Sequence, residues 1–210
     1  KFLCSKYIEA PWSVFEDTWK MCPGTYLVLE DGKTTVHTYW DIREKKAGGE
    51  AHPLTFEKAL QEMDSLVRDA VRRRLEADVP VGTFLSGGID STLVTAVARQ
   101  VSGGQVKSFS IGFHEKERNE AVYAAEIAAH IGTQHRELYI GDQETLEMIK
   151  DLPYYYDEPF SDSSQLPTML VSQLASEEIT VALSGDGGDE LYCGYQMYDW
   201  TYIAQKADWL

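Results

Sequence analysis

Residues 85–92 read LSGGIDST, and they lie between an apolar run, VPVGTFL (79–85), and an amphipathic run, LVTAVAR (93–99). An apolar run that turns through small residues into an amphipathic one is typical of a buried strand followed by a helix. Gly87 and Gly88 allow the connecting backbone to approach a ligand closely. The free N–H groups of such a turn point toward one place, where the helix dipole also favours negative charge. The stretch therefore predicts a binding site for a phosphate or pyrophosphate group.

A simpler interpretation is an ordinary strand-to-helix connection, with Asp90 or Ser91 as the N-cap of the helix. The length of the string and its flanking elements favour the phosphate site. No Gly-Lys-Ser/Thr follows the glycines, so this is not the lysine-bearing loop of common NTPases. The string SGGIDS resembles the PP-loop of the ATP pyrophosphatase superfamily, whose members adenylate their substrates and release pyrophosphate.

The composition limits the classes of partner. The chain has 210 residues, 43% of them hydrophobic, and a net charge of −15, which predicts neither a nucleic-acid partner nor an anionic membrane partner. Its three cysteines are scattered and form no C-x-x-C pair, which predicts buried or inert thiols and a cytoplasmic location. No apolar run reaches transmembrane length. The chain begins with Lys1 rather than methionine, which predicts a piece of a longer protein.

The first 45 residues differ in pattern from the rest. Two runs of alternating β-formers, 26–30 and 33–40, flank Asp31-Gly32, which is a strong signal for a β-hairpin. The segment is too short for an independent domain and predicts the edge of one. A polar connector follows over 46–54, and residues 55–210 form the second predicted domain.

Strands and helices then alternate along the chain. Thr55 predicts the start of a helix that runs to about residue 77; strands are predicted over 79–85, 106–113, 136–140 and 179–183, and helices over 119–131, 142–152 and 161–176. Repeated units of this kind predict an α/β fold, with a mainly parallel sheet and helices on both faces. Ligands in such sheets bind at the carboxyl ends of the strands.

A second glycine-rich string, LSGDGGDE (183–190), follows the last predicted strand. Two such strand ends can face each other across one cleft, although the string alone could also be an acidic turn. ATP would bring about four negative charges to a place that already holds Asp90, Asp186, Asp189 and Glu190. A hard divalent cation is therefore required between carboxylates and phosphates, and oxygen ligands beside phosphate predict Mg²⁺. Asp90 and Asp189 are the predicted metal ligands because each lies at the start of a helix.

The order of five strings makes the resemblance more specific. SGGIDS, SFSIGF (108–113), GTQH (132–135), YDEPF (156–160) and SGDGGDE together resemble the glutamine-hydrolysing asparagine synthetases. The resemblance implies that residues 1–45 are the tail of a glutaminase domain and that residues 55–210 are the first part of an ATP pyrophosphatase, or synthetase, domain. It also implies ATP as cosubstrate, with aspartate and glutamine-derived ammonia as substrates. A homodimer is compatible with the resemblance, and the sequence does not fix the oligomeric state.

The resemblance implies a reaction and a set of roles. The aspartate side chain attacks the α-phosphorus of ATP to give β-aspartyl-AMP and pyrophosphate, and ammonia then converts the acyl adenylate into asparagine and AMP. The resemblance also implies which residues of this chain contact each group. Pyrophosphate is held by Ser86, Gly87, Gly88, Asp90 and Ser91, and adenine by Phe84, Leu85 and Ile111. The α-phosphate or ribose is held by Ser184 and Gly185, Mg²⁺ by Asp90 and Asp189, and the acyl intermediate by Asp186 and Glu190. Asp186 stands where many members carry Glu, which leaves its role open.

The glutaminase nucleophile and a transition-state lysine of that family match nothing in this chain, so we expect these 210 residues alone to turn over neither glutamine nor aspartate. Two alternatives stay open: a related acyl-adenylating amidotransferase that acts on a sugar acid or forms a lactam, and a nucleotide-binding module without catalysis. The cluster Tyr154–Tyr156 before Pro159 is equally an acyl pocket or plain packing.

Overall fold

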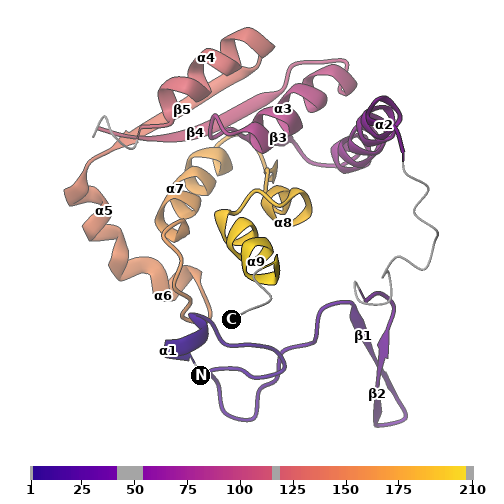
Figure 1. Ribbon diagram of the computed structural model, residues 1–210. Coiled ribbons are helices and arrows are strands. Elements are labelled where there is room, and N and C mark those ends of the chain that lie inside the picture. The colour runs from indigo at the N-terminus through magenta and orange to yellow at the C-terminus, as the bar shows by residue number, and fades with distance from the viewer. Residues whose placement is uncertain (1, 42–53, 115–118, 207–210) are drawn as a thin grey trace.

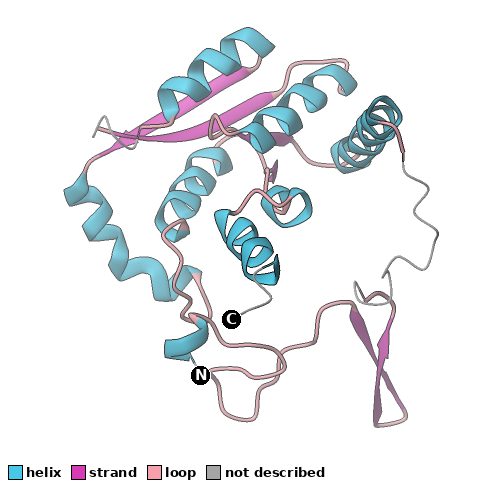
Figure 2. Ribbon diagram, in the orientation of Figure 1, coloured by secondary structure: helices cyan, strands magenta, loops and turns pink. Residues whose placement is uncertain are grey.

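The computed structural model describes residues 2–41, 54–114 and 119–206 (Figures 1 and 2). Its N-terminal part holds a short helix, α1 (Phe2–Ser5), and an antiparallel hairpin, β1 (Thr25–Glu30) and β2 (Lys33–Thr38). Asp31 and Gly32 both have positive φ, at 49° and 73°, as the two central residues of a type I′ turn require. The predicted hairpin is confirmed.

The second part is built on a four-stranded sheet. Its strands are β3 (Val81–Phe84), β4 (Lys107–Phe113), β5 (Gln134–Ile140) and β6 (Val181–Leu183), all parallel, in the order β5-β4-β3-β6. The chain moves outward from β3 through β4 to β5 and then returns to the other side of β3. The strand order thus reverses between β3 and β6, and the carboxyl ends of strands at such a reversal form the usual ligand crevice of open α/β sheets.

Helices cover both faces of the sheet (Figure 1), which confirms the predicted fold class. On one face, α2 (Phe56–Leu75) and α3 (Ile89–Val101) pack around Val71 and Val97, and α4 (Ala121–Ile131) packs on Leu85. On the other face, α7 (Gln165–Ser176) packs on Phe109. Phe84, the last residue of β3, packs in the cluster of Phe109, whereas the next residue, Leu85, packs against α4, so successive side chains serve opposite faces of the sheet.

Most helix limits have local causes. Thr55 is the N-cap of α2 and its hydroxyl accepts the N–H of Lys58, and Gly132 ends α4 with a φ of 79°. The helix expected from residue 161 begins instead at Gln165, because the Asp162 carboxylate accepts the N–H and hydroxyl of Ser164 in a preceding turn.

The helix expected over 142–152 is also divided. The structure has α5 (Asp142–Met148), a 3₁₀ turn (Ile149–Asp151) and α6 (Leu152–Tyr155) there, and it ends with α8 (Gly188–Tyr192) and α9 (Gln196–Lys206). The third predicted strand begins two residues early, at Gln134. The connector expected at 46–54 lies outside the described residues, apart from Leu54.

Two predictions about the surface have different outcomes. Within the described residues, no helix is long and apolar enough to cross a membrane. Cys4, Cys22 and Cys193 are unpaired, as expected, but all three are exposed, so the buried alternative of the expected "buried or inert" thiols is wrong.

Candidate functional site

The loop after β3 is held by its own serines. The Ser91 hydroxyl lies 2.9 Å from the Ser86 hydroxyl, accepts the N–H of Ser86 at 3.2 Å and donates to the carbonyl of Gly88 at 3.3 Å. Ser91 is buried, whereas Ser86 is exposed at the mouth of the loop. Ser91 therefore fixes the shape of the loop from inside, and Ser86 remains accessible to a ligand.

Gly87 and Gly88 have different structural roles in this loop. Gly87 has a φ of 86°, and a Cβ there would lie 3.1 Å from the Cβ of Tyr123 at the start of α4. Gly88 is the N-cap of α3, so no side chain caps the start of this helix. Asp90 and Ser91 both lie inside the first turn of α3, so the alternative in which one of them caps the helix is wrong. The N–H groups at this helix start face the edge of the sheet where β3 ends.

The loop after β6 packs directly against this helix start. A Cβ on Gly185 would lie 2.7 Å from the Ser91 nitrogen, and a Cβ on Gly188 would lie 2.5 Å from the carboxyl carbon of Asp90. Both distances are shorter than real side chains tolerate, so only glycine lets the two loops meet. Asp90 is consequently held between the loops that follow two neighbouring strands.

A cleft of about 950 Å³ opens over the two loops. The predicted site residues Phe84, Ser86, Gly88, Asp90, Ser91, Ser184, Gly185, Asp186 and Asp189 line it. Gly87 and Glu190 do not. The Glu190 carboxylate instead accepts the hydroxyl of Tyr195 at 2.8 Å, and this hydrogen bond raises the pKa of Tyr195 to about 12.

An apolar cavity of about 310 Å³ adjoins the cleft, and Phe84, Ser86, Glu120 and Val171 line both. The predicted residues Leu85 and Ile111 line the cavity together with Phe109, Phe113 and Pro167. A flat heteroaromatic ring suits such walls. Phe109 and Phe113 share the face of Ile111 by strand periodicity, so the sequence held the signal for both residues, although our prediction missed them.

Glu120 is a further acidic residue that our prediction missed. It precedes α4, the helix after β4, at the same edge of the sheet as the two glycine-rich loops. Its signal in the sequence was its position directly after Asn119, whose side chain accepts the N–H of Ala121 at the start of the helix.

The cleft is acidic. No Lys or Arg occurs among the described residues that line it, whereas Asp90, Asp186, Asp189 and Glu120 all do. A ligand with several phosphates therefore needs a cation to offset its charge. No group of three or more His, Cys, Asp or Glu side chains in the described part of the chain could hold a metal ion. Mg²⁺ fits one or two of the carboxylates that line the cleft, because it commonly takes only that many protein carboxylates and completes its shell with phosphate oxygens and water.

The tyrosine cluster lies beside the cleft. The Tyr156 hydroxyl donates to the carbonyl of Gln165 at 2.9 Å, and its ring packs edge-on against Phe160 at 5.1 Å. Thr168 lines both the cleft and a separate cavity of about 430 Å³ next to Tyr155 and Tyr156. Tyr154, by contrast, is 86% exposed, so the three tyrosines do not form one wall.

Known proteins resemble the chain over most of its length. A family model for asparagine synthase matches residues 62–210. A protein of Methanocaldococcus jannaschii is 37% identical over 196 residues, which cover 91% of this chain and 37% of that protein. Asparagine synthetase [glutamine-hydrolyzing] 1 of Bacillus subtilis is 31% identical over 199 residues, which cover 94% of this chain and 30% of that protein. The chain thus spans about a third of the length of these relatives.

Some solved structures are similar to part of the chain. The glutamine-dependent NAD⁺ synthetase of Acinetobacter baumannii in complex with ADP has a TM-score of 0.49 at 24% identity, over 70% of this chain and 29% of that one. The NH3-dependent NAD synthetase of Campylobacter jejuni has a TM-score of 0.45 at 17% identity, over 64% and 60%. The family match, which takes in both glycine-rich loops and every strand of the parallel sheet, makes this chain a member of the asparagine synthase family.

Proposed function

We propose that this chain is the nucleotide-binding part of an enzyme that makes asparagine from aspartate, ATP and glutamine-derived ammonia. One observation carries the proposal: two glycine-rich loops meet at the ends of β3 and β6 with no space for a Cβ, and they hold Asp90 between them at the floor of an acidic cleft. Such an arrangement suits a ligand whose phosphates contact backbone N–H groups and whose charge a cation offsets. Membership of the asparagine synthase family supports the choice of substrates.

The proposed reaction has two steps. A side-chain carboxylate oxygen of aspartate attacks the α-phosphorus of ATP, the bond from that phosphorus to the bridging oxygen breaks, and pyrophosphate leaves with the electron pair. Ammonia then attacks the acyl carbon of β-aspartyl-AMP, loses a proton and displaces AMP. Both steps build negative charge on phosphate oxygens, which N–H donors and a cation stabilise.

The cleft suggests a role for each group of residues. Ser86, Gly87, Gly88 and the α3 start would bind pyrophosphate, while Ser91 keeps their loop in shape. Phe84, Leu85 and Ile111 would hold adenine in the apolar cavity. Ser184 and Gly185 would contact the α-phosphate or ribose. Asp186, exposed at the cleft, would face the acyl intermediate.

We do not assign Glu190 to direct contact with the substrate. Its carboxylate is engaged by Tyr195 and does not line the cleft, so we assign it to support of α8 rather than to contact with the substrate.

Asp90 and Asp189 would hold Mg²⁺. A bound Mg²⁺ would supply charge neutralisation of the phosphates, and Asp90 is the better placed of the two because the glycines around it fix its carboxylate. Asp189 lies over Gly194, whose hydrogen-only side chain leaves room for a carboxylate oxygen that a Cβ would meet at 1.9 Å.

The domain assignment and the location are proposed on the same basis. We assign residues 1–45 to the end of a glutaminase domain and residues 55–210 to the start of the synthetase domain, since the family model begins at residue 62. Three unpaired, exposed thiols suit the reducing cytoplasm.

The proposed reaction can be tested by the transfer of an oxygen isotope from aspartate to AMP. The full-length protein that carries this chain is supplied with ATP, Mg²⁺, ammonium and aspartate labelled with ¹⁸O in its side-chain carboxylate. We expect asparagine, AMP and pyrophosphate in equal amounts, with one ¹⁸O transferred to AMP. ADP and phosphate as products would contradict the proposal, and so would pyrophosphate release with another carboxylic acid but not with aspartate.

A further inference from the structure

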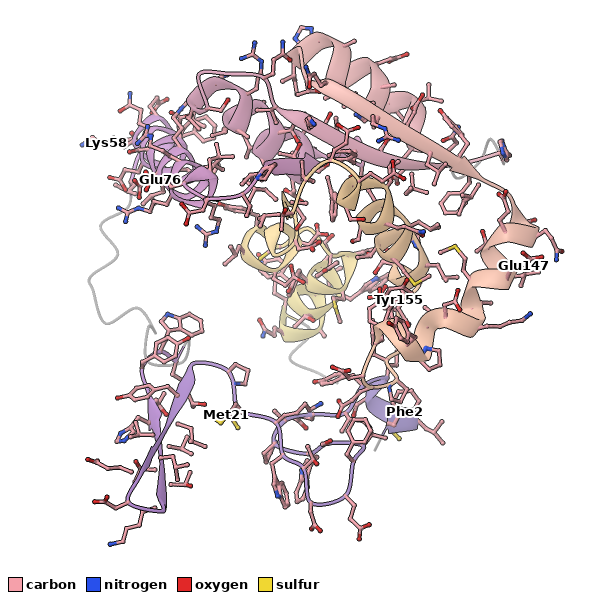
Figure 3. The ribbon with its side chains drawn as sticks, turned by 180° about the vertical axis from the view of Figure 1, so that it is seen from behind. Phe2, Met21, Lys58, Glu76, Glu147 and Tyr155 are labelled. Atoms are coloured by element: carbon pink, nitrogen blue, oxygen red, sulfur yellow. The ribbon has the colours of Figure 1, made fainter. Side chains whose placement is uncertain are left out.

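The N-terminal segment contacts the parallel-sheet part at the loop between α6 and α7. Figures 1 and 3 both place α1, which carries Phe2, beside the end of α6, which carries Tyr155. The backbone N–H of Ser161 donates to the carbonyl of Lys6 at 2.7 Å. This contact joins two regions that are more than 150 residues apart in the sequence.

Glu158 is the main side chain at this junction. One of its carboxylate oxygens accepts the backbone N–H of Val14 at 3.0 Å, and the other accepts the ammonium of Lys20 at 2.5 Å. Lys20 also donates to the carbonyl of Ile8. The Glu158 side chain is only 18% exposed, and the hydrogen bonds from Lys20 and Val14 lower its pKa.

The same loop is tied to the wall of the cleft. The side-chain amide of Gln165, the first residue of α7, donates to the carbonyls of Phe160 and Asp162 at 2.6 and 3.0 Å. About one and two turns further along α7, Thr168 and Val171 line the cleft. The loop after α6 is therefore bonded to Lys20 and Val14 at Glu158 and, two residues further along its backbone, at the Phe160 carbonyl to the first residue of the helix that forms one side of the cleft.

We propose that Glu158 is a positioning residue, and that its ion pair with Lys20 couples the glutaminase side of the protein to the synthetase cleft. The inference rests on the proposed function. Ammonia released on one side must reach the acyl adenylate on the other before it escapes to water. Loss of the ion pair leaves a half-buried charge without its partner and loosens the loop through which the N-terminal segment contacts the parallel-sheet part. Glutamine-dependent synthesis then suffers more than synthesis from free ammonia.

The test compares two nitrogen sources in the full-length protein. Lys20→Met removes the charge but keeps most of the length of the side chain, and Glu158→Gln keeps the shape of the carboxylate. For each variant we expect the rate of asparagine formation with glutamine to fall about three- to tenfold relative to the rate with ammonium. We also expect more than one glutamate released per asparagine formed. The double variant should be no worse than the single ones, since both break the same contact.

Lys107→Met is the matched control. Lys107 pairs with Glu178 at 2.8 Å and is about as exposed as Lys20, but it lies at the amino-terminal end of β4, away from the cleft. We expect this variant to keep the wild-type ratio of the two rates. The rate with ammonium also reports, within each variant, that the synthetase part is folded.

Two results would overturn the inference alone: an unchanged ratio in both Lys20→Met and Glu158→Gln, or an equal change in Lys107→Met. Absence of asparagine from either nitrogen source in the wild-type protein would overturn the proposed function and this inference with it. The two failures are therefore distinguishable.

Discussion

The position of the Asp90 side chain depends on two neighbouring glycines. Gly185 and Gly188 leave the space that its Cβ and carboxylate occupy, and Ser91, its neighbour, closes the loop from inside. The two glycines thus allow the carboxylate of Asp90 to lie close to the loop after β6.

Gly188→Ala tests this fixed position. The new Cβ would lie 2.5 Å from the carboxyl carbon of Asp90 and must displace it. We expect the affinity for Mg²⁺ and an ATP analogue, measured by calorimetric titration, to fall at least about tenfold, roughly 1.4 kcal/mol. Gly104→Ala is the control, because a Cβ there meets no atom within 4 Å. Equal affinity in the two variants would show that the packing around Asp90 does not matter for binding.

At the residue scale, the sequence could identify side chains but not their directions. It placed Ser91 among the phosphate ligands, and the structure turns its hydroxyl inward to brace the loop. It placed Glu190 in the catalytic group, and the structure turns that carboxylate toward Tyr195. In both pairs the partners are five positions apart, with one positive-φ residue between them, Gly87 in the first pair and Cys193 in the second, and no spacing rule predicts their orientation.

At the scale of elements, β4 and β5 are joined by more than backbone bonds. On the face that α4 covers, the two ring nitrogens of His135 on β5 lie 2.8 and 3.1 Å from the hydroxyls of Ser108 and Ser110 on β4. Burial lowers the pKa of His135, although the nearby Glu137 acts in the opposite direction. His135 is therefore neutral in the folded sheet at neutral pH.

This pairing predicts a dependence of stability on pH. The unfolded chain takes up a proton at His135 near pH 6.5, whereas the folded chain does so only at lower pH. Below about pH 6.5 the unfolded state binds more protons, so the free energy of unfolding falls by up to about 1.4 kcal/mol per pH unit. Denaturant unfolding between pH 7.5 and about 5.5 measures the slope. His135→Asn should flatten it, whereas His130→Asn, at an exposed position of α4, should not.

The hairpin, the four strands and most helices could be predicted because each carries a local signal, such as Asp31-Gly32 or the Gly132 stop. The start of α7 could not. The helix predicted from the sequence includes the polar run SDSS (161–164), and the turn that delays its start depends on how the Asp162 carboxylate bonds to Ser164. Competition between a side chain and the backbone for the same N–H is not visible in a periodic pattern.

At the scale of the whole molecule, the order of strands decides where the site lies. The sequence predicts a parallel sheet but not that β6 returns to the side of β3, since the order depends on how helices from both faces cover the sheet. That order brings the two glycine-rich loops together, although nearly 100 residues separate them in the chain. Likewise, nothing local in the sequence connects Lys20 with Glu158.

The central claim is that the cleft binds the phosphates of ATP through Mg²⁺ held by Asp90. The most direct measurement is a calorimetric titration of the α,β-methylene analogue of ATP into the full-length protein, with and without Mg²⁺. Asp90→Ala is compared with Asp142→Ala, since Asp142 also lies in the first turn of a helix but away from the cleft. We expect saturable binding that requires Mg²⁺, weakens at least about tenfold in Asp90→Ala and is unchanged in Asp142→Ala. Binding that ignores both Mg²⁺ and the loss of Asp90, or no binding by the folded protein, would contradict the account.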